Sequence, residues 1–193
     1  MIRTRAGYCG GQKQDPTYHD LGDHTETFQL DYDPRQLSYH EILDIFWNLH
    51  DPFSKGYSTQ YKAAVFYADA EQRRLAEESK DRLEQDSGKT VQTEILPLTE
   101  FYRAEDYHQK YYLRHNAVLM NELLSIYGSE REFIDSTLAA RLNSYTARHG
   151  FQSVLAQELE SYGLSEQGAE SVRTFASLLD EGAFSGGACG VPQ

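Results

Sequence analysis

Residues 9 to 26 contain a thiol, a glycine turn and a carboxylic acid close to a histidine. Cys9 is followed by Gly10 and Gly11, and after a polar loop the chain reaches His24 and Glu26. A cysteine thiolate is a nucleophile, and a carboxylic acid can donate a proton to a group that leaves during a reaction. These residue types, at this spacing, indicate thiol-based redox chemistry.

The second cysteine, Cys189, lies near the other end of the chain in the glycine-rich segment 185–190. Such a segment is too rich in glycine to pack rigidly, and a thiol on it is suited to act as a resolving cysteine by thiol–disulfide exchange. Simpler alternatives stay open for both cysteines. Cys9 could be a small hydrophobic residue beside the turn, and Cys189 could be an exposed thiol without a role.

The polar loop also contains metal-ligating residue types, in His19-Asp20 and Asp23-His24. Imidazole and carboxylate groups bind several divalent ions. The spacing matches no specific site template, and histidines in a polar loop are usually solvated. We therefore predict neither a metal nor a cofactor.

The composition indicates a folded, acidic protein of one domain or of one domain with an appendage. The chain has 193 residues, 14 tyrosines, 9 phenylalanines and a formal net charge of −12. A chain of this length buries a sizeable core, and disordered chains are poor in aromatic residues. A nucleic-acid-binding protein would need a basic face, which this sequence lacks. We therefore expect no nucleic-acid partner.

Targeting signals are also missing from the sequence. No apolar run reaches the roughly 18 residues of a membrane span, and Arg3 and Arg5 lead into glycine and not into the apolar core of a signal peptide. We expect a cytoplasmic protein with no membrane partner, although an address upstream of Met1 could have been lost.

Strands and helices alternate in the part of the chain that must position these groups. A strand over 1–8 ends at the glycine turn, and alternation over 26–32 predicts a half-buried strand. Ser38 and Glu41 form a capping box, which predicts a helix over 38–49. A strand, a charged helix and another strand are predicted over 62–67, 69–86 and 91–96, the first of them central because both its faces are apolar.

The rest of the chain predicts helices. A capped helix opens at Ser129, a shorter helix covers Val154 to Leu159, and a last one covers Val172 to Leu179. We assign residues 1–115 to an α/β domain, 116–182 to a helical extension and 183–193 to a flexible tail.

Short motifs occur along residues 1–112 in an order that is typical of one enzyme family. They are Arg3-Thr4-Arg5-Ala6-Gly7-Tyr8, Pro16-Thr17-Tyr18, His24-Thr25-Glu26, Asp31-Tyr32-Asp33-Pro34, Phe46-Trp47, His50-Asp51-Pro52, Gln60-Tyr61-Lys62, Thr93-Glu94-Ile95 and the run from Phe101 to Gln109. In this order they resemble peptide methionine sulfoxide reductase of the A type. The resemblance implies an α/β (α+β) fold, a two-layer sandwich with a mixed sheet, and it does not explain the helices after residue 115.

The resemblance also implies thiol-dependent reduction of the S epimer of methionine sulfoxide in peptides or proteins. In the family a cysteine thiolate attacks the sulfur, a glutamic acid protonates the departing oxygen, and tyrosine hydroxyls hold that oxygen. A second cysteine then forms a disulfide, which a thioredoxin-like reductant resets. Glu26 matches the proton donor, Tyr8 and Tyr61 match the oxygen-holding tyrosines, and His24, before the acid, is placed with the substrate-binding residues.

The sequence departs from the family at two places. The nucleophile motif Gly-Cys-Phe-Trp-Gly is absent, together with the first strand, the first helix and an aromatic wall for the methyl group. The loop Phe53–Thr59 is shorter and lacks the family's aspartate. Three explanations stay open: a fragment of a longer protein, a degenerate relative that binds without reducing, and a thiol that has moved to Cys9, with Cys189 as the resolving cysteine.

A further expectation concerns the sheet. If Met1 is the true start, the sheet lacks an inner strand and its backbone groups face a gap. The C-terminal segment, or a second copy of the chain in a homo-oligomer, would have to fill that gap.

Overall fold

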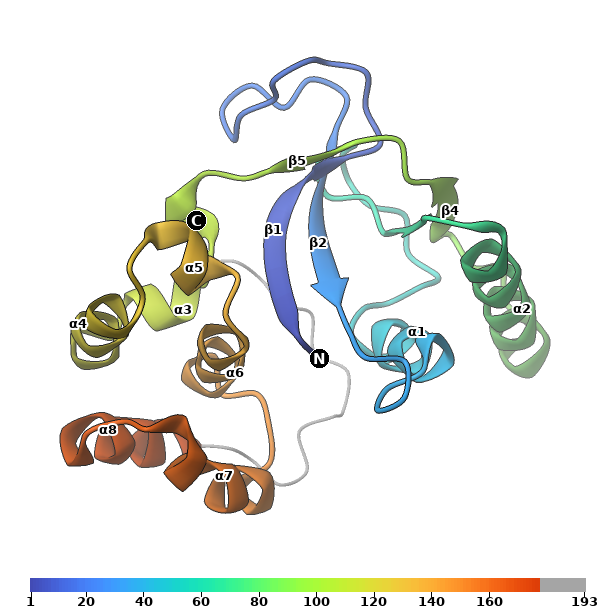
Figure 1. Ribbon diagram of the computed structural model, residues 1–193. Helices are drawn as coiled ribbons and strands as arrows, with labels where there is room; N and C mark the ends of the chain where they lie inside the picture. The colour runs from blue at the N-terminus through green and yellow to red at the C-terminus, as the bar shows by residue number, and fades with distance from the viewer. Residues whose placement is uncertain (178–193) are drawn as a thin grey trace. The chain divides into compact units, whose positions relative to one another are not determined.

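β1 (Arg3–Cys9) lies between β2 (Thr25–Asp31) and β5 (Phe101–Arg103) in a three-stranded sheet (Figure 1). The computed structural model describes residues 1–177. β5 pairs with β1 in antiparallel register, with Gly7 opposite Arg103 and Cys9 opposite Phe101. Position 7 requires glycine, because a Cβ atom there would collide with the ring of Phe101 and the carbonyl of Tyr102.

The described residues divide into two compact units, and β1 and β2 each contribute to both. The α/β unit comprises residues 7–28 and 33–104, and the helical unit comprises residues 1–6, 29–32 and 105–177. Residues 105–115, predicted as the end of the α/β domain, therefore belong to the helical unit. In the part of the chain that the structure describes, no helix combines the length and the hydropathy needed to span a bilayer.

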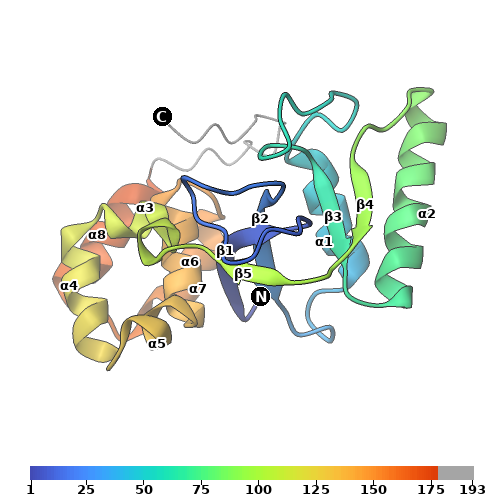
Figure 2. The same cartoon turned by 90° about the horizontal axis from the view of Figure 1, so that it is seen from above.

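In the α/β unit a parallel pair is built from β3 (Ala64–Tyr67) and β4 (Glu94–Pro97), which α2 (Ala70–Ser87) connects (Figure 2). Parallel strands need such a crossover because a tight turn cannot join them. The side chain of Asp69 caps the start of α2, and Gly88 ends the helix at a φ of 66°. α1 (Tyr39–Asn48) begins with the predicted capping box of Ser38 and Glu41.

The mixed α/β fold class is confirmed, but the parallel and antiparallel pairings lie in two separate small sheets. The prediction that the strand over 62–67 is central is wrong for the described residues, where β3 has β4 as its single paired strand. Apolar side chains on both faces of a strand indicate that both faces are covered by other parts of the protein. Its place in a sheet depends on the pairing of its backbone, which the pattern does not encode.

The core of the α/β unit forms where α1 meets α2 and the parallel pair. Leu43 and Trp47 of α1 pack there with Ala76 of α2 and with Val91. The buried indole nitrogen of Trp47 donates a hydrogen bond of 3.0 Å to the hydroxyl of Ser79. Trp47 is therefore held by an apolar contact and by a polar one.

Replacing Ser79 by alanine is expected to lower the free energy of unfolding by about 1–2 kcal/mol, because the buried indole N–H loses its acceptor. Urea unfolding followed by Trp47 fluorescence measures the change. Ser87→Ala, at an exposed serine of the same helix, is the control and should cost less. Equal losses in both variants would contradict a special role for the Trp47–Ser79 pair.

The helical unit is built from six short α-helices within the described residues: α3 (Tyr111–Arg114), α4 (Ala117–Ile126), α5 (Glu130–Ile134), α6 (Thr137–Thr146), α7 (Gln152–Glu158) and α8 (Glu166–Ala176). Two 3-10 segments, Asp106–His108 and Leu159–Tyr162, complete it. Leu119, Phe133 and Leu142 are among its fully buried residues.

The long helix predicted from Ser129 is two helices, α5 and α6. The side chain of Ser136 accepts a hydrogen bond from the backbone N–H of Ala139 and donates one to the carbonyl of Phe133. A capping serine inside an apolar stripe starts a new helix, because its hydroxyl satisfies the first free backbone groups. The last helix starts earlier than predicted, after the cap Ser165, and Leu178 and Leu179 lie outside the described residues.

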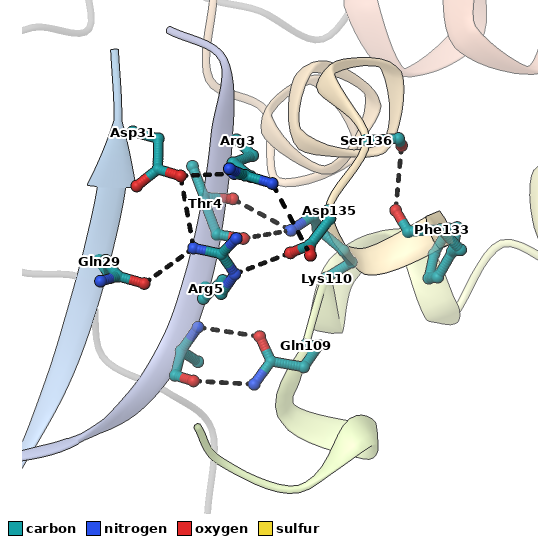
Figure 3. A network of polar contacts seen from close by, with 11 residues as sticks. Arg3, Thr4, Arg5, Gln29, Asp31, Gln109, Lys110, Phe133, Asp135 and Ser136 are labelled. Carbon is teal, nitrogen blue, oxygen red and sulfur yellow. Dashed lines mark hydrogen bonds and ion pairs between the residues drawn. The ribbon is translucent and has the colours of Figure 1, made fainter. Parts of the chain in front are cut away.

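Side chains hold the first part of β1 inside the helical unit (Figure 3). The amide of Gln109 donates to the carbonyl of Ala6 and accepts from its N–H, at 2.8 and 2.9 Å. Nζ of Lys110 donates to the carbonyl of Thr4 at 2.6 Å, and Arg5 donates to Asp135 at 2.7 Å. Gln109 and Lys110 thereby satisfy backbone groups of β1 that a neighbouring strand would otherwise bind. The filling of a sheet gap by the C-terminal segment or by a second copy of the chain stays a prediction.

Candidate active site

Glu26 lies beside Gln60 and Tyr61, in the α/β unit. The backbone N–H of Glu26 donates to the carbonyl of Gln60 at 3.1 Å, and the hydroxyl of Thr25 donates to the carbonyl of Thr59 at 2.9 Å. The amide nitrogen of Gln60 donates to Oε1 of Glu26 at 2.6 Å and to the hydroxyl oxygen of Tyr61 at 3.1 Å. The start of β2 and the segment before β3 are thereby joined around a half-buried carboxyl group.

Tyr61 is the phenol that the structure brings to this carboxyl group. Its side chain remains 42% exposed. Partial loss of water, the negative charge of Glu26 and a hydrogen bond with Tyr18 raise the pKa of Tyr61 above its usual range. The phenol is therefore protonated at neutral pH and can donate a hydrogen bond to a bound oxygen atom.

Tyr57 adds a second ring to the same surface. It lies in the loop Phe53–Thr59, is 85% exposed, and its ring centroid is 5.2 Å from that of Tyr61. An exposed aromatic side chain supplies a large, rigid contact area for a ligand. Carboxyl, amide, phenol and exposed ring thus lie together, a combination that can hold a polar oxygen and its apolar neighbours.

Tyr8 lies in the interior of the same unit. It is 2% exposed and stands opposite Tyr102 in the pairing of β1 with β5. Its predicted role in holding the substrate oxygen stays a prediction.

His24 is buried and folds the loop 10–24 onto itself. Its Nδ1 accepts from the N–H of Gly11 at 3.2 Å, and its Nε2 lies 2.8 Å from the carbonyl of Lys13. This pattern requires a neutral ring with the hydrogen on Nε2. Gly11 must be glycine, because a Cβ atom there would lie 2.7 Å from the His24 ring. Both ring nitrogens are thus used within the loop, which gives His24 a structural role, and its contact with substrate stays a prediction.

Asp23 supports the same loop. Its carboxylate accepts hydrogen bonds from the backbone N–H groups of Gln12, at 2.9 Å, and Lys13, at 3.2 Å. These two N–H groups, that of Gln12 first, lower the pKa of Asp23. The loop before β2 is therefore ordered by its own side chains, and this order fixes where the strand that carries Glu26 begins.

Cys9 has the opposite properties to those of a nucleophilic cysteine. Its side chain is fully buried, and burial raises the pKa of the thiol despite backbone hydrogen bonds at Gly10 and Thr99. Reactive cysteines are accessible and have a lowered pKa. The structure therefore gives no support to the hypothesis of a thiol moved to Cys9. Cys189, predicted as the resolving cysteine, lies outside the described residues.

Metal-ligating side chains do not gather in the α/β unit or elsewhere in residues 1–177. No group of three or more histidine, cysteine, aspartate or glutamate residues is close enough to hold an ion there. In the loop from His19 to His24, which contains the metal-ligating residue types, both ring nitrogens of His24 already form hydrogen bonds with backbone groups.

Sequence reasoning did not assign roles to Gln60, Tyr18 or Tyr57. Gln60 directly precedes Tyr61 in the motif Gln60-Tyr61-Lys62, and Tyr18 ends the motif Pro16-Thr17-Tyr18. Both positions could have been marked from those motifs. Tyr57 carried no such signal, since it lies in the loop that departs from the family.

Comparison with known proteins decides the family. The family model described as peptide methionine sulfoxide reductase matches residues 1–140. The chain belongs to the peptide methionine sulfoxide reductase family. The match extends into α6, beyond residue 112, where the sequence motifs end, so that the family also accounts for the first helices of the helical unit.

Relatives in the peptide methionine sulfoxide reductase family match most of this chain. Peptide methionine sulfoxide reductase A5 of Arabidopsis thaliana is 40% identical over 153 residues, which are 76% of this chain and 59% of that protein. The Drosophila melanogaster reductase is 38% identical over 167 residues, or 86% of this chain and 67% of that protein. The chain therefore spans about three fifths of the length of the A5 relative.

A solved structure shows the same fold. The crystal structure of Mxr1 from Saccharomyces cerevisiae in reduced form aligns with a TM-score of 0.54 and 26% identity. The alignment covers 58% of this chain and 70% of that one.

Proposed function

We propose that the chain reduces methionine (S)-sulfoxide in peptides and proteins to methionine. The arrangement of Glu26, Gln60 and Tyr61 carries this proposal, because it places an acid beside an exposed phenol in a member of this family. Glu26 protonates the departing oxygen and Tyr61 holds it, with Tyr8 and His24 as further contributors to the substrate site.

The reaction needs a thiol. A thiol that takes the oxygen of the sulfoxide becomes a sulfenic acid, and the sulfoxide gains two electrons to become methionine. One thiol of a thioredoxin-like dithiol condenses with the sulfenic acid to a mixed disulfide and water, and the second thiol of that reductant then attacks the mixed disulfide, which releases the protein thiol and leaves the reductant as a disulfide. Because Cys9 is buried, we propose that Cys189, which the sequence predicted as the resolving cysteine, is the reacting thiol instead. The low number of cysteines supports our further proposal that the protein is cytoplasmic, and the family match supports our proposal that it repairs oxidised proteins.

The second candidate is a non-catalytic module that binds methionine sulfoxide without reducing it. The buried thiol of Cys9 and the missing aspartate of the loop Phe53–Thr59 favour it. The two candidates share the binding surface and differ in turnover.

Incubation with a methionine sulfoxide peptide and dithiothreitol, followed by mass spectrometry of the peptide, separates the candidates. We expect the peptide to lose one oxygen atom with the wild type and with Cys9→Ser, and to keep it with Cys189→Ser. Binding without loss of oxygen in the wild type would favour the non-catalytic module. Loss of turnover in a folded Cys9→Ser protein would restore Cys9 as the nucleophile.

A further inference from the structure

We propose that Gln60 is a positioning residue that holds the carboxyl group of Glu26 and the phenol of Tyr61 in the arrangement that receives the sulfoxide oxygen. The effect of Gln60 on catalysis rests on the proposed function. The coupling of Glu26 to Tyr61 through one amide group does not depend on that function and can be tested without turnover.

Gln60 forms two hydrogen bonds with Glu26. Its carbonyl accepts the backbone N–H of Glu26 at 3.1 Å, and its side-chain nitrogen donates to Oε1 of the same residue at 2.6 Å. Backbone and side chain of the acid are therefore fixed by one residue from the segment before β3. The bond from Thr25 to the carbonyl of Thr59, at 2.9 Å, keeps the two segments in register one residue earlier.

The chemistry of the amide fixes its orientation. The nitrogen of Gln60 lies within hydrogen-bond distance of a carboxyl oxygen and of the Tyr61 oxygen, at 2.6 and 3.1 Å. A glutamine nitrogen has two hydrogens, one for each of these acceptors, whereas the amide oxygen has no hydrogen to donate to the carboxylate. The amide thus separates the oxygen atoms of Glu26 and Tyr61 and binds both.

This arrangement also directs the hydrogen of the phenol. Because the oxygen of Tyr61 accepts from Gln60, its own hydrogen points to another acceptor. In the free protein Tyr61 makes a hydrogen bond with Tyr18. A sulfoxide oxygen that replaces this partner would receive a hydrogen bond from Tyr61 while it lies near the acid.

Without Gln60 the acid and the phenol would lose their common partner. Glu26 is half-buried and Tyr61 is partly exposed, so that burial alone does not confine either side chain to one rotamer. Misplacement of a catalytic group by about 1 Å can lower a rate by about 100-fold. The expected defect of a Gln60 variant therefore lies in the chemical step more than in binding.

A double-mutant cycle tests the coupling directly. The pKa of the Tyr61 phenol is measured by NMR with 13Cζ-labelled tyrosine. The change in that pKa caused by Glu26→Gln is determined first in the wild type and then in Gln60→Met. We expect the effect of Glu26→Gln on Tyr61 to shrink at least about twofold when Gln60 is methionine. Gln36→Met, at an exposed glutamine, is the control and should leave that effect unchanged.

Two further measurements complete the test. Gln60→Asn keeps an amide that is too short to reach both partners, and it should show the same loss of coupling, which guards against a folding defect in Gln60→Met. With the methionine sulfoxide peptide and dithiothreitol, Gln60→Met should lower kcat by about 10-fold to 100-fold and change KM little. If the wild type shows no turnover, the proposed function fails, and the titration cycle alone decides the role of Gln60. Unchanged coupling in both Gln60 variants would overturn the inference.

Discussion

Glu26→Gln is expected to lower kcat for methionine sulfoxide reduction by about 100-fold or more, with the fold and peptide binding retained. General acid catalysis contributes about 10²–10⁴-fold to a rate, and a glutamine of nearly the same shape has no acidic proton for the departing oxygen. The side chain of glutamine can still contact Gln60, so the loss reflects chemistry more than structure. The measurement is kcat with saturating methionine sulfoxide peptide and dithiothreitol.

The titration of Tyr61 provides a check on the same variant that does not depend on turnover. The carboxylate of Glu26 is one of the groups that raise the pKa of Tyr61, so its removal should bring that pKa closer to the ordinary value of tyrosine. Glu77→Gln, at an exposed glutamate of α2 that pairs with Arg73, is the matched control and should change neither quantity. A wild-type kcat in Glu26→Gln would contradict the assignment of Glu26 as the proton donor.

The candidate site lies entirely within one unit. Glu26, Tyr57, Gln60 and Tyr61 all belong to residues 7–28 and 33–104. The contacts that join them connect the start of β2 with the segment before β3, and none of these contacts involves a residue of the helical unit. The arrangement of acid and phenol therefore follows from the local structure of the α/β unit.

The elements that the sequence predicted well are those with local signals. The capping box of Ser38 and Glu41 places the start of α1 within one residue, since both partners lie in the same turn. β5 was missed, because a strand of three residues is too short to show a period and forms by pairing with β1. The break between α5 and α6 was also missed, although Ser136 is a good capping residue, because the apolar stripe continues across it.

In the candidate site, some residues could be identified from short sequence motifs, whereas the roles of others depend on contacts between distant positions of the chain. Glu26 and Tyr61 could be named from family motifs, and the structure brings them together. Gln60 acquires its role from a partner 34 positions away along the chain, which no local pattern reveals. The burial of Cys9 is likewise a property of the packed unit, since a cysteine next to two glycines reads equally well as an accessible thiol.

The second large effect is expected at Lys110, whose removal should change how stability depends on pH. Lys110 is 5% exposed, and its Nζ donates to the carbonyl and the hydroxyl of Thr4 at 2.6 and 3.2 Å. Burial lowers the pKa of Lys110 to about 8, the charges of Arg5 and Arg114 act in the same direction, and Asp135 opposes them. The folded protein therefore releases this proton at a lower pH than the unfolded chain, whose lysine titrates near 10.5.

The sign of the effect follows from proton binding. Between about pH 8 and pH 10.5 the unfolded chain holds more protons at Lys110 than the folded protein, so this residue makes stability rise as the pH rises. A pKa difference of this size corresponds to a change on the order of 3 kcal/mol across that window, and below it the full cost of the buried ammonium is present. The tyrosines and other lysines also titrate in this range, and a comparison with a variant removes their shared contribution.

Lys110→Met should therefore lose this rise, while its lost hydrogen bonds to Thr4 add a cost that does not vary with pH. Urea unfolding of the wild type and the variant at a series of pH values from 7 to 11 measures the difference in slope. Lys89→Met, at an exposed lysine of the α/β unit, is the control and should keep the wild-type slope. If Lys110→Met and the wild type gain stability equally between pH 8 and 10.5, Lys110 is not the titrating group, and the contacts that hold β1 to the start of α3 carry no pH dependence.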